Sequence, residues 1–338
     1  MRAWILEEQA QIEDRPLKLV EVLTPHARDD EVRIKVDVCG VCRTDIHIAE
    51  GDLPLKKSPI ILGHEAVGVV DEVGKSVQRF KVGDKAGVYW LHNACGMCKY
   101  CLSQRENYCP EFKATGWDEH GGFAEYVTIP ARNALPLNDI QLEPAEIAPL
   151  LCPGIAGYAA FKLTEVQRGD KLGLYGFGPT AHCVLKVAQS LGIRTYVSTR
   201  SRKNIERATR EGANWVADVT KKPLPCNLDA AIIFPAAGNL VEPALSHLDK
   251  GGTLVMAPVS SSQIVIDNYS QNLWGRSLNT LYNVTKYDAE GFFKIIRDHG
   301  LDIKIGTSLF PFESLQDALI QVKHGALEQP NAVIKIAE

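Results

Sequence analysis

The second half of this 338-residue chain alternates between two hydrophobic patterns, and this alternation restricts the possible folds more than any other feature. Short apolar runs such as KLGLYG (171–176) and TYVST (195–199) are typical of buried strands. Amphipathic stretches at 179–191 and 202–212 follow them and predict helices. The series continues through WVADV, DAAIIF and GTLVMA, with NLVEPALSHL as a helix between the last two. Strands that alternate with helices predict a parallel sheet covered on both faces.

The first part of the chain has a different pattern. Short alternating runs are separated by Gly, Pro and Asp turns, which predicts a β-rich domain with strands at 31–38, 66–73, 85–89 and 124–129. After Tyr287 the pattern predicts two helices and a final strand, NAVIKI. Because a chain of this length usually forms two domains, we expect an α/β protein in which a doubly wound domain is inserted into a β-rich domain.

Composition and charge exclude several classes of function. The net charge is -4 and no run of Lys and Arg is present, which argues against nucleic acid or an anionic membrane as the main partner. The N-terminus, MRAWILEEQAQIEDR, becomes acidic too early for a signal peptide, and no apolar stretch approaches the length of a membrane span. We therefore expect a cytoplasmic protein, in which nine cysteines indicate metal binding or catalysis before disulfides.

Four cysteines form one compact loop. Cys95, Cys98, Cys101 and Cys109 have the spacing C-x2-C-x2-C-x7-C. Four thiolates suit the tetrahedral coordination of a structural zinc ion. An iron–sulfur cluster also uses four thiolates, and a disulfide pair is a third interpretation that a reducing compartment disfavours. The spacing favours zinc, and such a site folds a lobe without taking part in chemistry, because no coordination position remains open.

A second cysteine pair, Cys39 and Cys42, follows a predicted strand in VCGVCRTDIH (38–47). A C-x-x-C pair can be a redox dithiol, half of a zinc site or two buried thiols. Taken alone, His64 in GHE is a hydrogen-bonded structural residue, and Cys152 in APLLCPGIAGY is a small buried side chain. The spacing does not show whether Cys42, His64 and Cys152 meet in the folded protein.

A glycine-rich turn joins the first strand of the alternating region to its helix. Its residues are Gly176, Phe, Gly178, Pro179, Thr180 and Ala181. Between a strand and a helix this pattern predicts a dinucleotide-binding turn. Gly176 permits the tight turn, and Gly178 lets the backbone approach a pyrophosphate at the helix N-terminus. Ala181 allows close packing of helix and strand, and Pro179 suits the first helical position.

Five motifs occur in order along the chain: GVCRTDIH, GHEAVG, the four-cysteine loop, APLLCPGIAGY and GFGPTAH. In these motifs the chain resembles the zinc-containing medium-chain alcohol dehydrogenases, in particular the bacterial branch that is similar to cinnamyl alcohol dehydrogenases. The resemblance covers essentially the whole chain. It implies a GroES-like catalytic domain over residues 1–153 and 286–338, with a structural zinc lobe at about 92–112. It also implies a Rossmann dinucleotide-binding domain, a doubly wound parallel sheet, over residues 154–285.

The resemblance further implies a catalytic zinc ion held by Cys42, His64 and Cys152, with the fourth position open for water or an alcohol. Zinc would favour ionisation of a bound alcohol, or polarise an aldehyde for hydride attack. Cys39 is then a strand-end thiol outside the ligand set, and its pairing with Cys42 on oxidation is the lesser alternative. Together with the four-cysteine loop, this predicts two zinc ions per chain.

The same resemblance implies a proton relay from Thr44 through the cofactor ribose toward His47. Asp45 is expected to accept a hydrogen bond from the His64 ring and so fix its tautomer, while Glu65 supports the metal. The alternative interpretations are a turn-capping hydroxyl for Thr44, an exposed helix residue for His47, and partly buried carboxylates in ion pairs for Asp45 and Glu65.

The end of the next strand favours NADP(H) over NAD(H). NAD enzymes usually carry an acidic residue there to bind the ribose hydroxyls. Here Thr199 takes that position and Arg200 and Arg202 follow, so two guanidiniums and no carboxylate would face a 2′-phosphate. The resemblance adds Arg43 as a pyrophosphate contact, with an ordinary surface arginine as the rival interpretation. Many family members have an arginine before the last strand that helps to hold the pyrophosphate, and this chain has Asn331.

We therefore expect a zinc-dependent alcohol dehydrogenase or aldehyde reductase that transfers hydride between NAD(P)(H) and a small primary or secondary alcohol or its aldehyde. A polyol-type dehydrogenase is the second interpretation, although Cys152 weighs against it because such relatives usually have a carboxylate there. A non-catalytic protein that binds zinc and nucleotide is the third. Trp90 and Trp117 are candidates for lining an apolar pocket or for core packing. Relatives of this kind imply a homodimer or homotetramer.

Overall fold

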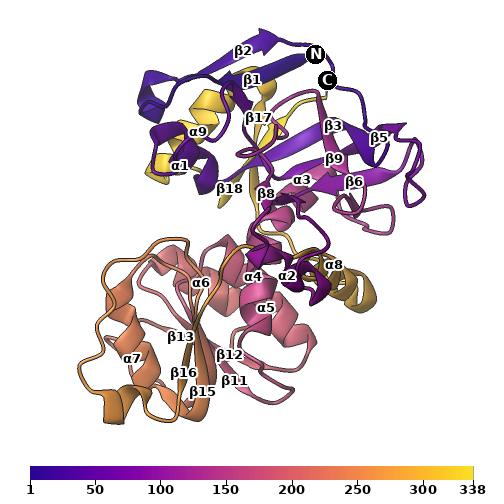
Figure 1. Cartoon of the computed structure of the whole chain (residues 1–338). Helices are drawn as coiled ribbons and strands as arrows, with labels where there is room; N and C mark the ends of the chain where they lie inside the picture. Colours follow the sequence, from indigo (N-terminus) through magenta and orange to yellow (C-terminus); the bar gives the residue numbers. More distant parts are fainter. Residues whose placement is uncertain (338) are drawn as a thin grey trace. The chain divides into compact units, whose positions relative to one another are not determined.

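The computed structural model describes residues 1–337, which divide into two compact units (Figure 1). Unit 1 comprises Met1–Cys152, Asn283–Asp298 and Lys304–Glu338. Unit 2 comprises Pro153–Tyr282 and His299–Ile303. The chain therefore completes most of unit 1, builds most of unit 2, and returns to unit 1 with Asn283–Asp298, after which residues 299–303 belong again to unit 2. Within residues 1–337, no helix combines the length and the apolar character that a bilayer crossing requires.

Unit 1 is built mainly from antiparallel strands. Its largest sheet has the strand order β10-β6-β5-β3-β18-β17, with β9 also paired to β3, and smaller sheets have the orders β2-β1-β4 and β7-β8. The strands are β1 (Arg2–Leu6), β2 (Leu17–Glu21), β3 (Glu31–Val41), β4 (Ile60–Ile61), β5 (Ala66–Val73), β6 (Lys85–Val88), β7 (Leu91–Asn93), β8 (Lys113–Ala114), β9 (Tyr126–Pro130), β10 (Leu135–Pro136), β17 (Thr307–Pro311) and β18 (Asn331–Lys335).

Strand β3 is longer than the sequence pattern indicates. The alternation of polar and apolar residues predicts a strand that ends at residue 38, whereas β3 continues to Val41. The extension pairs with β18 from the other end of the chain, with Cys39 opposite Ile334 and Val41 opposite Ala332. A local pattern cannot reveal a pairing with so distant a partner. Cys39 therefore lies inside the strand, where it is fully buried, and is not a strand-end thiol.

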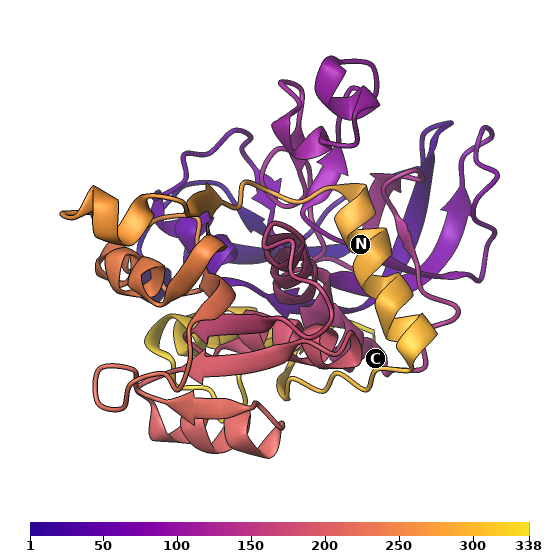
Figure 2. The same ribbon diagram turned by 90° about the horizontal axis from the view of Figure 1, so that it is seen from below.

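Helices pack against the sheets of unit 1. The two helices predicted after residue 287 are present, but β17 lies between them and was not predicted. Helix α9 packs against β17, β18 and α1, and α8 is seen along its length in Figure 2. The helices are α1 (Arg43–Glu50), α2 (Lys99–Leu102), α3 (Pro144–Ile147), α8 (Lys286–His299) and α9 (Leu315–His324), with short helices η1 (Ile12–Asp14), η2 (Glu106–Tyr108), η3 (Ala148–Leu151) and η6 (Phe312–Ser314).

Unit 2 is a parallel sheet with the order β13-β12-β11-β14-β15-β16, which confirms the predicted doubly wound architecture. Figure 1 shows α5 on one side of this sheet and α7 on the other. The elements are β11 (Lys171–Tyr175), β12 (Arg194–Ser198), β13 (Trp215–Ala217), β14 (Leu228–Ile233), β15 (Leu248–Met256), β16 (Ser277–Thr280), α4 (Pro153–Lys162), α5 (Pro179–Ser190), α6 (Arg202–Arg210), α7 (Val241–Ser246), η4 (Gly238–Leu240) and the π-helix η5 (Tyr269–Leu273).

The strand order of unit 2 reverses beside β11. From β11 the chain moves outward through β12 to β13, and then crosses to β14 on the other side of β11. In open parallel sheets, ligands bind at the carboxyl ends of the strands next to such a reversal. The turn between β11 and α5 lies at this position, which is where the glycine-rich motif occurs.

The C-terminal strand is expected to be essential to the stability of unit 1. Ile334 of β18 is fully buried between β17 and β3. Because its removal would leave a cavity in the core, Ile334→Ala should lower the free energy of unfolding by about 2–5 kcal/mol. The exposed neighbour provides the control, since Lys335→Ala should change it by no more than about 0.5 kcal/mol. Urea unfolding of both variants measures the difference, and equal stabilities would contradict this account of β18.

Candidate functional site

Four side chains of unit 1 that are distant in sequence meet in one place. Cys42, His64, Glu65 and Cys152 each offer one ligand atom, and these atoms lie within 4.8 Å of one another. The Sγ atoms of Cys42 and Cys152 are 3.8 Å apart. Two thiolates of a tetrahedral zinc site, with Zn–S bonds of about 2.3 Å, would be separated by about 3.8 Å. Both the kind of donors and their spacing therefore fit zinc.

A buried carboxylate joins the two segments that carry Cys42 and His64. Cys42 caps α1, and its N–H donates to Oδ2 of Asp45 at 2.9 Å. Oδ1 of Asp45 accepts a second hydrogen bond of 3.1 Å from the N–H of Gly63. Nδ1 of His64 lies 3.5 Å from the same Oδ1 and, among residues 1–337, has no hydrogen-bond partner. The expected hydrogen bond from His64 to Asp45 stays a prediction: the two atoms lie at ion-pair distance, and the carboxylate, which has about four acceptor sites, also accepts the two backbone N–H groups.

The electrostatics of the cluster favour a charged sulfur. The hydrogen bond from the Cys152 thiol lowers the pKa of Cys42 well below its ordinary value, and the same bond together with burial raises the pKa of Cys152. One thiolate and one thiol therefore share a proton, and the thiolate is the form that binds metals. Burial also raises the pKa of the Glu65 carboxyl group, because the residue is only 3% exposed.

Gly40 makes room for the Glu65 carboxylate. A Cβ at position 40 would lie 2.0 Å from Oε2 of Glu65, so any side chain there would displace it. This glycine stands between the two cysteines of the C-x-x-C pair, but the pattern of the pair does not indicate its role. The motifs predict a supporting role for Glu65, and the structure brings its carboxylate within 4.8 Å of the other three donor atoms.

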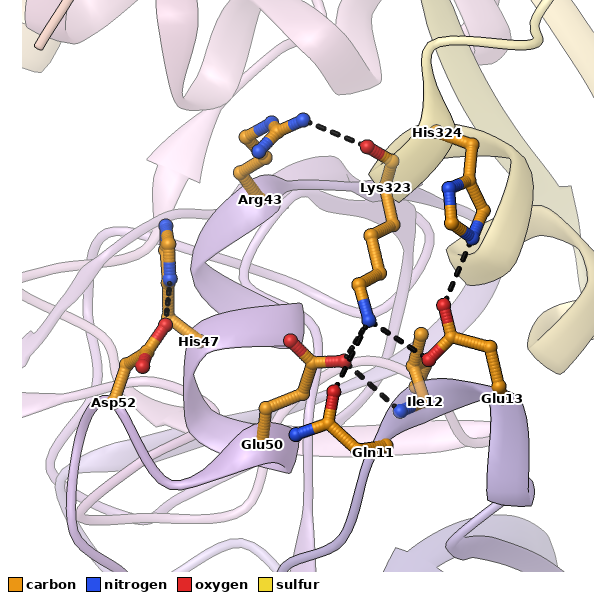
Figure 3. Close-up of polar contacts among 9 residues, drawn as sticks. All are labelled: Gln11, Ile12, Glu13, Arg43, His47, Glu50, Asp52, Lys323 and His324. Carbon is orange, nitrogen blue, oxygen red and sulfur yellow. Dashed lines mark hydrogen bonds and ion pairs between the residues drawn. The ribbon is translucent and has the colours of Figure 1, made fainter.

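Helix α1 carries the residues predicted to relay a proton. The hydroxyl of Thr44 lies 3.6 Å from Sγ of Cys42, next to the donor cluster. His47 follows three positions later on the same face of the helix, and its side chain is 41% exposed. Nδ1 of His47 lies 2.7 Å from a carboxylate oxygen of Asp52, a partner that no sequence motif predicts (Figure 3). Thr44 thus lies beside the donor cluster, and His47 lies nearer to solvent.

Both ends of α1 are tied to the end of α9 (Figure 3). At the first turn of α1, the Arg43 guanidinium donates a 2.8 Å hydrogen bond to the carbonyl of Lys323. At the last turn, Glu50 accepts a 2.7 Å hydrogen bond from the Lys323 ammonium, which also donates to Glu13 at 2.7 Å. The helix with Thr44 is therefore held at two points.

Aromatic side chains lie beside the cluster. The Trp90 ring meets the His64 ring edge to face, with centroids 5.1 Å apart, and stacks on Trp117 at 6.1 Å. The Trp90 indole N–H donates to Asn283 at 3.0 Å. Nζ of Lys56 is 3.6 Å from the centre of the Trp117 ring. Trp90 therefore packs against the ring of His64 and restricts its orientation. This contact is compatible with both expected roles of Trp90, lining an apolar pocket and core packing.

The cysteines of the four-cysteine loop also meet. Their Sγ atoms lie within 4.8 Å of one another, with separations of 3.5 Å for Cys95–Cys109, 3.6 Å for Cys98–Cys101 and 3.9 Å for Cys95–Cys101. All four are free, so the disulfide interpretation does not apply. A hydrogen bond from the backbone N–H of Cys101 lowers the pKa of Cys98 to about 7. The separations again match the roughly 3.8 Å expected for tetrahedral zinc.

The glycine turn of unit 2 has the backbone that its sequence predicts. Gly176 has a φ of +87°, which L side chains rarely adopt. Gly178 caps α5, Pro179 takes the first helical position, and Ala181 is fully buried. A Cβ at Gly178 would meet no atom within 4 Å, so the surface above this residue is open. The turn therefore leaves space for a ligand at the start of α5, where Thr180 is half-buried.

The residues expected near the adenosine ribose follow β12. Thr199 is buried, and its N–H donates to the carbonyl of Ala217 at 3.0 Å. Arg200 and Arg202 are both exposed. Nε of Arg202 pairs with Glu206 one turn further along α6, at 2.9 Å. A phosphate ligand would have to compete with this ion pair for Arg202.

Asn331 does not replace the missing arginine as a cation. It is buried at the start of β18, and its side-chain amide donates to the carbonyl of Gly306 at 3.1 Å, next to β17. Its position is explained by this contact between two strands.

Comparison with known proteins identifies the family. Residues 28–139 match the alcohol dehydrogenase GroES-like domain. The chain is 40% identical over 333 residues to a probable alcohol dehydrogenase, AdhA, of Mycobacterium tuberculosis, covering 97% of this chain and 95% of that protein. The chain belongs to the zinc-containing medium-chain alcohol dehydrogenase family. It is also 35% identical to an alcohol dehydrogenase of Geobacillus stearothermophilus, covering 82% of this chain and 84% of the relative.

The fold of this alcohol dehydrogenase agrees with that assignment. Its structure is similar to a cinnamyl alcohol dehydrogenase of Sorghum bicolor, with a TM-score of 0.85, 25% identity, and coverage of 99% of this chain and 97% of the other. The predicted fold, a GroES-like sheet domain with a Rossmann-type parallel sheet, is therefore confirmed. The protein is an oxidoreductase that acts on a small-molecule alcohol or aldehyde.

The contacts of Lys323 in the alcohol dehydrogenase predict a pH-dependent stability. Hydrogen bonding to Lys323 lowers the pKa of Glu13 from 4.5 to about 2. A pKa that is lower in the folded state stabilises the fold above pH 4.5, and this contribution is lost as the pH falls toward 2. Lys323→Met should therefore lower the melting temperature at neutral pH, and the difference from wild type should shrink in acid. Calorimetry between pH 2 and pH 7 measures it.

The control replaces an exposed lysine that forms no ion pair among residues 1–337. Lys113→Met should leave the melting temperature unchanged across the same pH range. A Lys323→Met variant with wild-type stability at neutral pH would show that the contacts between α9, α1 and η1 do not stabilise unit 1.

Proposed function

We propose that this alcohol dehydrogenase depends on zinc and NADP(H) and interconverts small primary or secondary alcohols and the corresponding carbonyl compounds. Unit 1 would act as the catalytic domain and unit 2 as the dinucleotide-binding domain. The observation that supports this most strongly is the convergence of Cys42, His64, Glu65 and Cys152 beside the hydroxyl of Thr44. Thiolates, an imidazole and a carboxylate are the ligands that zinc takes in proteins.

Cys42, His64 and Cys152 would hold the catalytic zinc ion, which when bound supplies a Lewis acid beside the reacting carbon–oxygen bond. Glu65 is close enough to be a fourth ligand, so its carboxylate has to leave one coordination position free for the substrate. Cys95, Cys98, Cys101 and Cys109 would hold the structural ion, because four thiolates leave no open position.

Two residues of α1 would move the proton. The half-buried hydroxyl of Thr44 both donates and accepts hydrogen bonds, so it can take the proton of the alcohol and pass it on. His47 would deliver it to solvent, because its ring is partly exposed. Asp52 holds Nδ1 of His47 at 2.7 Å and thereby leaves Nε2 as the nitrogen that exchanges protons. Asp45 contributes by fixing the backbone on which Cys42 and His64 are mounted.

The preference for NADP(H) is supported by the residues after β12. Thr199 is neutral, and Arg200 is exposed directly after it. A guanidinium binds phosphate oxygens through paired N–H groups, whereas an acidic residue at Thr199 would repel a 2′-phosphate. Arg43 at the start of α1 is the proposed contact for the pyrophosphate. The expected homodimer or homotetramer and the cytoplasmic location stay predictions.

Turnover of a panel of simple aldehydes with NADPH and with NADH is the decisive experiment. We expect the wild type to reduce aldehydes with a higher kcat/KM for NADPH. Thr199→Asp should invert the preference and change the ratio by about 10–100-fold, because the new carboxylate repels the 2′-phosphate. Absence of turnover with both cofactors in a zinc-loaded protein would instead favour a non-catalytic zinc- and nucleotide-binding protein. Activity confined to polyols would favour the polyol-type dehydrogenase.

Metal analysis separates the two cysteine clusters. We expect two zinc ions per wild-type chain. Cys42→Ser should lose one ion and reduce kcat more than about 100-fold while the melting temperature stays close to that of wild type. Cys98→Ser should also lose one ion, but with a marked loss of stability, because a structural zinc site contributes to folding. Cys226→Ser, outside both clusters, should keep both ions. A wild-type chain without zinc would refute the proposal.

A further inference from the structure

Arg207 of α6 lies against the glycine turn of unit 2. Its Nη2 atom donates a 2.6 Å hydrogen bond to the carbonyl oxygen of Phe177. The guanidinium carbon also lies 5.1 Å from the centre of the Phe177 ring, a cation–π distance. Phe177 is 1% exposed and stands between Gly176 and Gly178. One arginine thus contacts both the backbone and the side chain of the central residue of the turn.

Burial partly removes the charged guanidinium of Arg207 from water, which lowers the stability of the fold. Arg207 is half-buried, and burial lowers the pKa of its guanidinium. Its Nε has no hydrogen-bond partner within residues 1–337, and no carboxylate there lies within ion-pair distance of it. The nearby Glu211 pairs instead with Lys186 at 2.7 Å and with His182 at 3.5 Å. Because an apolar side chain would avoid the cost of desolvating a charge, stability alone does not account for Arg207.

The hydrogen bond to Arg207 fixes the peptide that joins Phe177 to Gly178. A trans peptide is planar, so its N–H points away from its carbonyl oxygen. With the Phe177 carbonyl turned toward Arg207, the N–H of Gly178 points in the opposite direction. This N–H donates to no acceptor within residues 1–337, and the space above Gly178 is open.

The orientation of this peptide matters for anion binding at the turn. Free N–H groups at a helix N-terminus bind phosphate groups, and Pro179, the first residue of α5, has no N–H to offer. The N–H of Gly178 therefore carries a larger share of the binding. A flip of this peptide changes ψ of Phe177 and φ of Gly178, and a glycine offers little steric resistance to rotation. If it flipped, a carbonyl oxygen would face the anion.

We propose that Arg207 is a positioning residue, which holds the Phe177–Gly178 peptide in the orientation that binds the pyrophosphate of the dinucleotide. This inference rests on the proposed function, because it requires that unit 2 binds a nicotinamide dinucleotide. It does not depend on the choice between NADPH and NADH, since both contain the same pyrophosphate. Arg207 therefore acts differently from Arg200, whose proposed partner is the 2′-phosphate.

The test measures the dissociation constants of NADPH and NADH by calorimetry, together with the melting temperature. Arg207→Met should weaken both cofactors by the same factor, about tenfold, which is the effect of one hydrogen bond to a charged group. The melting temperature should be equal to or higher than that of wild type, because a buried charge has been removed. Arg207→Lys should recover part of the affinity. Arg210→Met, an exposed arginine of the same helix, should bind both cofactors as the wild type does.

Three results would overturn the inference while the proposed function stands. The first is that Arg207→Met binds both cofactors as tightly as the wild type, and the second is that it binds only NADPH more weakly. The third is that it binds both cofactors more weakly and has a lower melting temperature, which Arg207→Lys restores. The second would make Arg207 a contact of the 2′-phosphate, and the third would give it a purely structural role. A wild-type protein that binds neither NADPH nor NADH would refute the proposed function itself and the inference with it.

Discussion

The pairing of β18 with the end of β3 determines where the active region of unit 1 begins. Val38–Val41 remain a strand because β18 pairs with them on one side and β5 pairs with Val38 and Cys39 on the other, and the chain turns into α1 only after Val41. That turn places Cys42 at the first position beyond the sheet and Thr44 in the first turn of the helix. The carboxylate of Asp45 then ties the same turn to the segment of His64. A shift of β3 by one residue would reverse the faces of Cys39 and of its neighbours in the strand.

The sequence predicted the architecture well because its signals are local. The apolar runs of unit 2 and the helices between them have the lengths and periods that a parallel sheet requires, and the glycine turn occurs at its expected place. The end of β3 and the short strand β17 were not predictable, because both depend on pairing between segments far apart in the chain. Burial and hydrogen bonding by distant residues decide such cases.

The sequence predicted which residues form the site, but it did not predict which of them contact one another. The motifs named Cys42, His64 and Cys152, but only the fold shows that their donor atoms meet and that a Glu65 oxygen lies within 4.8 Å of each of them. Asp45 lies beside His64 as expected, but it also accepts hydrogen bonds from two backbone N–H groups, which no pattern of side chains predicts. Asp52 and Arg207 were not identified because each acts on one neighbour, and neither belongs to a recognisable motif.

The insertion of unit 2 into unit 1 has a consequence for how this enzyme is made. During synthesis the central strand β3 emerges before unit 2, whereas its partner β18 emerges after every other strand that the structure describes. All six strands of the parallel sheet precede β18 in the part of the chain that the structure describes, so unit 2 can form first. Until then one edge of β3 lacks its partner, and unpaired strand edges promote aggregation. The edge of β3 therefore stays open from the time it emerges until β18 pairs with it.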